Sequence, residues 1–165
     1  MKVGLPSALL NPYYISFWKP FFEELSQEII MTPETTKEIL DKGIRHTVPE
    51  ICVPIKIYVG HIIELIEKGA DKIYIPRFVS IRKQDAFCPK FLALPDLLIS
   101  TISGLKDKIL THWIESKDDN IATISNFLEI GKILTGDTKL IHRAIKLGNE
   151  KWTKFRELCC KEHYS

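Results

Sequence analysis

The sequence predicts an α/β fold: a three-layer arrangement with a mainly parallel sheet of about four strands, helices on both faces and a helical C-terminal segment. Short β-branched runs alternate with longer segments of helical periodicity, which is typical of parallel strands joined by helical crossovers. The 165 residues suit one domain. Their hydrophobic content of 45% and charged content of 27% are those of a packed globular protein.

The first quarter of the chain predicts two strands around one helix. A short buried strand is expected over residues 2–6 and a second, β-branched strand over 28–31. Between them, apolar residues recurring every fourth position predict a helix over 15–26. Pro20 lies within that stretch, so the helix is expected to begin or bend there.

Helix-start signals follow the second strand. Thr32, as a cap before Pro33 and Glu34, predicts the beginning of a helix. A second helix is predicted over 54–68, where isoleucine and valine residues share one face and Gly69 supplies the stop.

The second half predicts further strands and then helices. A strand is expected over 71–76, extended through 78–81, and residues 108–114 fit either a strand or a helix. Asp96 is expected to cap a helix that begins at Pro95. The segment 121–158 is predicted to be helical, with a break at Gly136.

Charge and composition exclude several classes of protein. The formal charge of +2, from 23 basic and 21 acidic residues, gives no electrostatic case for nucleic-acid binding. No segment has the roughly 20 apolar residues that cross a bilayer, and the N-terminus lacks the unbroken apolar core of a signal peptide. We therefore expect a cytoplasmic protein, whose four cysteines are thiols or metal ligands rather than disulfides.

Common catalytic motifs are missing from the sequence. It contains no Gly-x-Gly-x-x-Gly, Walker loop, Gly-x-Ser-x-Gly elbow or His-Glu-x-x-His. The histidines are scattered without a metal-binding partner at helical spacing, and each is expected to be a surface or structural residue. They are His46, His61, His112, His142 and His163.

Two cysteines carry more information. Cys52 precedes the helix predicted over 54–68, where backbone N–H groups and the helix dipole favour a thiolate. Cys88 lies in a loop after the strand predicted over 71–81, before Pro89. Both loops should end at one edge of the parallel sheet, where open α/β sheets hold ligands. Two thiols there suit a soft metal or an iron–sulfur cluster, and plain buried thiols are the alternative.

The C-terminal cysteines give a weaker signal. Cys159 fits the apolar stripe of the predicted helix and is expected in the core, whereas Cys160 points elsewhere. Adjacent cysteines rarely ligate one metal together, so neither is expected to join a site.

Motifs spread along the chain resemble a known family, DUF2229, which is related to 2-hydroxyacyl-CoA dehydratase subunits and is described as a CoA-substrate-specific enzyme activase. The order and spacing of these motifs hold from residue 3 to about 96, and a weaker match continues at 127–132. The matching runs are VGLPSALL at 3–10, FWKPFFEEL at 17–25, TPET at 32–35, CVPIK at 52–56 with Gly60-His61, IPR at 75–77, and CPKF at 88–91 with LPD at 94–96.

The resemblance implies a Rossmann-like domain whose cysteines hold a [4Fe–4S] cluster. In the related dehydratases, such a cluster receives an electron from an ATP-driven activator protein and passes it to an acyl-CoA thioester. Mapped onto this sequence, Cys52 and Cys88 are the candidate metal ligands. An acyl-CoA substrate and an activator are then the implied partners. No third cysteine sits at a comparable strand end, so Cys159 or Cys160 would have to fold back, or a partner subunit or a missing C-terminal domain would supply the rest.

Other residues within the matching runs are candidate ligand contacts. Arg77 and Lys90 would make the sheet edge positive, which suits an anionic CoA ester or the sulfides of a cluster. Lys56 and His61 could orient the site or contact a ligand, or simply belong to a helix surface. Ser7, after the first strand, could cap a helix or bind a phosphate.

Two other functions remain open at this point. The missing third cysteine also suits a cluster-free binding or scaffolding domain that docks a partner subunit. Zinc held by the cysteines together with His61 or His46 is a third option. We expect a single domain over 1–165, which is either the N-terminal part of a longer protein or a short, stand-alone member of the family.

Overall fold

A parallel sheet forms the centre of the protein in the computed structural model, which describes residues 1–83, 87–118 and 120–162. Its four strands run in the order β2-β1-β3-β5. They are β1 (Lys2–Leu5), β2 (Glu28–Met31), β3 (Lys72–Tyr74) and β5 (Ile109–Leu110). The order places β2 and β3 on opposite sides of β1. The strand order therefore has its switch point between β1 and β3, where open α/β sheets bind ligands.

Two further strands prolong one side of the sheet. β4 (Arg77–Ser80) follows β3, β6 (Trp113–Glu115) follows β5, and the two pair in parallel. Backbone hydrogen bonds continue across the gap, since the amide of Ile75 donates to Leu110 O and the amide of Arg77 donates to His112 O, both at 2.9 Å. The break falls at Pro76, which has no N–H to donate. The strand predicted over 71–76 and extended through 78–81 is thus present as β3 and β4, divided at Pro76.

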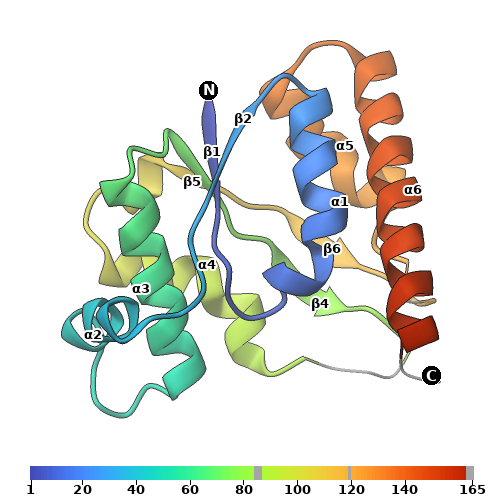
Figure 1. Ribbon diagram of the computed structural model, residues 1–165. Coiled ribbons are helices and arrows are strands. Elements are labelled where there is room, and N and C mark those ends of the chain that lie inside the picture. The colour runs from blue at the N-terminus through green and yellow to red at the C-terminus, as the bar shows by residue number, and fades with distance from the viewer. Residues whose placement is uncertain (84–86, 119, 163–165) are drawn as a thin grey trace.

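Helices cover both faces of the sheet, as predicted (Figure 1). One face carries α1 (Asn11–Glu24), α5 (Ile124–Leu134) and α6 (Thr138–Glu162). The other carries α3 (Val53–Glu67), α4 (Pro89–Thr101) and the short 3-10 helix η1 (Leu105–Asp107), and α2 (Lys37–Arg45) packs on α3. Each layer has its own core, so the architecture is a three-layer α/β sandwich.

Alternation along the strands divides the apolar side chains between these two cores. Val3, Leu5 and Tyr74 pack with α1, α5 and α6, whereas Ile73 and Ile75 pack with α3 and α4. Because successive side chains of a strand point to opposite faces, a sheet that is buried on both faces needs apolar residues at every position. The short β-branched strands in the sequence have that character.

Glycines bring α2 and α3 into close contact. A Cβ atom on Gly43 would lie 1.7 Å from Lys56 O, and one on Gly60 would lie 1.9 Å from Ile39 O. No larger residue fits either position without moving a helix backbone. This crossing fixes α3, and with it the residue at its N-terminus.

Two helix starts in the first half differ from the prediction. Helix α1 begins at Asn11 rather than Ile15, because Pro12 occupies a first-turn position, where no N–H is required; Pro20 lies inside the helix. Helix α2 begins at Lys37 rather than after Thr32. Thr36 is its cap and accepts a hydrogen bond from the amide of Ile39.

The start of α4 also corrects the prediction. Cys88 is the N-cap of α4 and Pro89 its first residue, so the helix begins six residues before Pro95, which lies inside it. Asp96 is therefore not a cap. The remaining elements match the prediction: β1, β2, α3, a strand rather than a helix at 108–114, and a helical tail broken at Gly136. Among the described residues, no helix is long and apolar enough to span a membrane.

Candidate functional site

Both candidate cysteines lie at helix N-termini. Cys52 is the N-cap of α3, and its carbonyl accepts hydrogen bonds from the amides of Ile55 and Lys56 at 3.0 and 3.2 Å. Cys88 occupies the same position on α4, where its carbonyl accepts from the amide of Phe91 at 2.9 Å. Each cap is followed within two residues by a proline, and both thiols are exposed and free.

A lysine joins the two cysteine loops. Lys90, two residues after Cys88 and in the first turn of α4, lies near enough to the Cys52 thiol to lower its pKa. The backbone amide of Ile55 lowers the pKa of Cys52 most, and Lys90 lowers it further, whereas partial desolvation opposes both. The thiolate of Cys52 is thus favoured by the start of its own helix and by a cation from the neighbouring loop.

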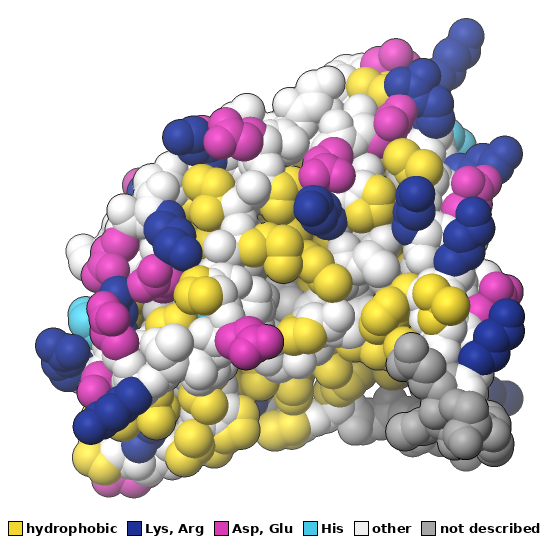
Figure 2. Space-filling view, in the orientation of Figure 1, with side chains coloured by type: hydrophobic (Ala, Val, Ile, Leu, Met, Phe, Trp, Pro, Cys, Tyr) yellow, Lys and Arg dark blue, Asp and Glu magenta, His cyan; other side chains and the backbone are white. Residues whose placement is uncertain are grey.

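The influence of Lys90 on Cys52 brings together segments 38 residues apart in the sequence. Residues near the two cysteines in the sequence also expose apolar surface: Val48 before α3, Val53 in α3 and Leu92 in α4 are each at least 38% exposed. Hydrophobic side chains gather along the lower edge of Figure 2, where Figure 1 places the α2–α3 turn and the starts of α3 and α4. We call Cys52, Cys88, Lys90 and these three apolar residues the cysteine edge.

Ser7 and His61 belong to a hydrogen-bonded network that joins β1, β2 and α3. The Ser7 amide donates to Thr32 Oγ1 at 2.8 Å, and Ser7 Oγ donates to the Thr32 carbonyl at 2.6 Å. His61 is fully buried; its Nδ1 lies 2.6 Å from Thr32 Oγ1 and its Nε2 lies 3.0 Å from Thr35 Oγ1. Burial lowers the pKa of His61, so a neutral ring bridges the two threonines.

That network gives Ser7 and His61 structural partners. Because both ring nitrogens of His61 are engaged by hydroxyl groups, the ring has no free nitrogen for a metal. Thr32, which the sequence suggested as a helix cap, is instead the centre of the network. The sequence did hint at this role, because Thr32 directly follows β2 and so lies at the carboxyl edge of the sheet.

Two other candidate contacts are also held by neighbouring residues. Lys56 Nζ donates to the Pro49 carbonyl at 2.9 Å and so ties down the loop that precedes Cys52. Arg77 makes a bidentate pair with Asp96, with Nη–Oδ distances of 2.6 and 2.7 Å, and donates to Leu92 O at 2.9 Å. This pair anchors α4 to β4. Of the three cationic residues predicted as ligand contacts (Lys56, Arg77 and Lys90), Lys90 is the one that lowers the pKa of Cys52.

Histidines other than His61 were expected to be surface or structural residues. His46 Nδ1 lies 2.8 Å from the Lys42 carbonyl, and His142 is exposed. His112 is buried, with Nε2 2.8 Å from the hydroxyl of Tyr74, and burial lowers its pKa to about 4. His163 lies outside the described residues.

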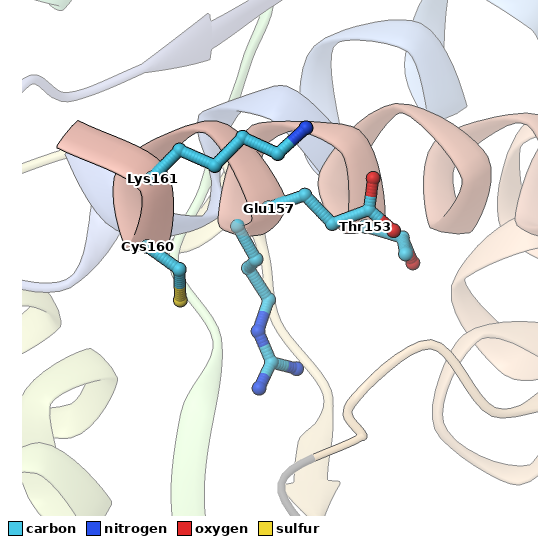
Figure 3. A pocket seen from close by; sticks show the side chains of 5 residues that line it. Thr153, Glu157, Cys160 and Lys161 are labelled. Atoms are coloured by element: carbon cyan, nitrogen blue, oxygen red, sulfur yellow. The ribbon is translucent and has the colours of Figure 1, made fainter. Parts of the chain in front are cut away.

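The C-terminal cysteines lie beyond the core. Cys159 is exposed, which corrects its expected place in the apolar stripe, because α6 continues past its last fully buried residue, Trp152. Cys160 lines a cleft of about 660 Å³ along the final turns of α6, and its thiol points away from the helix (Figure 3). Thr153, Arg156, Glu157 and Lys161 are the other described residues lining it; neither Cys52 nor Cys88 is among them.

The number of available ligand side chains decides whether the described residues could hold a complete iron–sulfur cluster. A [4Fe–4S] cluster takes thiolate ligands, and Cys52 and Cys88 provide two exposed sulfurs at neighbouring helix starts. Within residues 1–83, 87–118 and 120–162, no group of three histidine, cysteine, aspartate or glutamate side chains is placed to hold a metal ion. The described residues therefore fit part of a cluster site and do not complete it.

Comparison with known proteins identifies the family. The model of the CoA enzyme activase uncharacterised domain (DUF2229) matches residues 2–165, essentially the whole chain. No curated protein and no solved structure gave a significant match. The match confirms the family that the motifs in the sequence resemble, and the chain belongs to the DUF2229 family of CoA enzyme activase domains.

Proposed function

We propose that this domain works in a CoA enzyme activase system, where Cys52 and Cys88 act as two thiolate ligands of an iron–sulfur site. One observation carries the proposal: two exposed cysteines cap neighbouring helices, and Lys90, two residues after Cys88, lowers the pKa of Cys52, at the sheet edge where parallel α/β folds bind ligands. Exposure, helix N-termini and a cationic neighbour all favour the thiolate form that binds iron.

The proposed role is low-potential electron transfer to an acyl-CoA dehydratase-type reaction, in keeping with the family. The remaining ligands would come from a partner protein or from another segment, since the cysteine edge offers two thiols. The exposed apolar side chains of the cysteine edge support docking around the site, because burying them on a partner is favourable. An ATP-dependent activator or a dehydratase subunit is the partner class that the family suggests.

Metal analysis after anaerobic purification and reconstitution tests this proposal. We expect iron and acid-labile sulfide in the wild-type protein, and a loss of both in Cys52→Ser and Cys88→Ser variants. The control is a Cys159→Ser/Cys160→Ser double variant, which removes two exposed thiols from α6 and should keep its iron. Equal iron in the Cys88→Ser variant and the wild type would refute the ligand assignment.

A second candidate is a cluster-free domain that docks a partner subunit. The observation that favours it is the lack of a third donor beside Cys52 and Cys88 among the described residues. In that case reconstitution yields no bound iron, and a Val53→Asp substitution on the cysteine edge still abolishes binding to the cognate dehydratase subunit in a pull-down. A protein that binds zinc after aerobic purification, with no iron after anaerobic work, would instead support the zinc option.

A further inference from the structure

A second cleft lies away from the cysteine edge, between β6 and α5. Its volume is about 590 Å³, within the range of small-molecule sites. The residues after β6 form one wall and the first turns of α5 form the other, so the cleft opens at the carboxyl end of a parallel strand. It shares no lining residue with the cysteine edge.

The walls of this cleft are held together by a buried amide. Asn126 is 6% exposed; its Oδ1 accepts from the Glu115 amide at 3.3 Å, and its Nδ2 donates to the carbonyls of Glu115 and Ile121, both at 3.0 Å. One side chain thus joins β6 to α5 and uses its hydrogen-bonding groups to do so. A cleft with walls fixed in this way is preformed, which lowers the cost of binding.

An exposed tryptophan stands in the cleft. Trp113 is 58% exposed, whereas Trp18 and Trp152 are almost completely buried. The Arg77 guanidinium lies 5.7 Å from the centre of the Trp113 ring and is itself fixed by Asp96. The ring is therefore oriented by the protein while much of its surface stays in contact with solvent. An exposed indole at a cleft is suited to contact a ligand through its apolar face.

The charges of the lining select the type of ligand. Three described lining residues carry a carboxylate (Glu115, Asp118 and Glu129), and one carries an ammonium group, Lys117. Asp118 is used within its own loop, where it accepts a hydrogen bond from Ser116. Glu115 and Glu129 make no ion pair among the described residues, so the described lining, with Asp118 and Lys117, carries a net negative charge.

We propose that this cleft binds a small organic cation, of the primary amine class, through the Trp113 ring and the carboxylates of Glu115 and Glu129. An indole face attracts cations by its quadrupole, and the two carboxylates supply the opposite charge. The hydroxyl of Ser125, 3.0 Å from that of Thr123 on the same wall, adds an acceptor for an ammonium N–H group. The net negative lining disfavours phosphates and carboxylates, so the ligand differs from an anionic CoA ester.

Isothermal titration calorimetry with three four-carbon probes tests the proposal on the full chain. Putrescine, 1,4-butanediol and succinate share a chain length and differ in charge. We expect saturable binding of putrescine that weakens as salt is added, and no binding of the other two. Binding of 1,4-butanediol or succinate as tight as that of putrescine, or no saturable binding of putrescine, would overturn the proposal.

Matched variants locate the binding. A Glu115→Gln/Glu129→Gln double variant keeps both side-chain shapes and should weaken putrescine binding about tenfold, from a few-fold per exposed ion pair. Trp113→Leu should weaken it roughly threefold. Glu28→Gln, at the start of β2, removes a charge outside the cleft and should leave the affinity unchanged. Equal affinities in all of these variants would place the binding elsewhere and refute the site.

Discussion

Substitution of Gly60 by alanine tests the helix crossing that fixes the start of α3. The new Cβ would lie 1.9 Å from Ile39 O, and contacts to a Cβ are not found below 3.0 Å, so the α2 backbone must move by at least about 1.1 Å. Overpacking of a core typically costs about 1–3 kcal/mol, and a clash with backbone belongs at the upper end. Alanine recovers about 1 kcal/mol of helix propensity, which leaves a net loss of about 2 kcal/mol.

Urea unfolding followed by circular dichroism measures this loss. Gly136→Ala is the matched control: no atom lies within 4 Å of its added Cβ, so its free energy of unfolding should stay within about 0.5 kcal/mol of the wild type. A Gly60→Ala protein as stable as the wild type would refute the close crossing of α2 and α3, and with it the fixed position of Cys52.

Three further predictions follow from electrostatic contacts. Lys90→Gln should raise the pKa of Cys52 and slow its alkylation at neutral pH by a few-fold, because the thiolate loses a cation, as measured by mass spectrometry of each cysteine. Asp96→Asn should lower the free energy of unfolding by about 1 kcal/mol, since it breaks the pair with Arg77 at a carboxylate that is largely exposed. His112 should make the protein less stable as pH falls from about 6.5 to about 4, because the unfolded chain binds the proton first; the full loss is about 3 kcal/mol and His112→Asn should remove it.

Each of these predictions has a control. Lys56→Gln should leave the alkylation of Cys52 unchanged, because that ammonium group binds the Pro49 carbonyl. Lys19→Gln, in a half-exposed pair with Glu23 at 3.9 Å, should have almost no effect on stability. An acid-induced loss of stability that is the same in the wild type and the His112→Asn protein would show that His112 is not its source.

Periodicity and strand composition predicted most of the fold. The β-branched runs at 28–31 and 71–81 and the isoleucine-rich face at 54–68 form the elements expected of them, because both faces of the sheet need apolar residues. The errors lie at helix starts. Thr32 and Pro33 form a good start signal locally, but the threonine hydroxyl is already used by the Ser7 amide and His61 from distant segments. A single sequence does not reveal such competition.

The candidate site stays a prediction, drawn from the rule that parallel strands bring their following loops to one edge. The sequence indicated Cys52, Cys88 and Lys90 as residues of that edge, but gave no sign that Arg77 would be bound by Asp96, 19 residues away. It also gave no sign of the cleft beside Trp113, which forms when α5 packs against β6 through Asn126. Side-chain partners depend on tertiary packing, and local patterns do not encode them.

Cross-linking of the two cysteines tests the shared edge most directly. In a Cys159→Ser/Cys160→Ser protein, Cys52 and Cys88 are the remaining thiols, and a short bifunctional maleimide can react with both. We predict one bridged product within a single chain, identified by mass spectrometry as the peptide of Cys52 joined to that of Cys88. Two separate, singly attached linkers with no bridged peptide would contradict a common site for the two thiols.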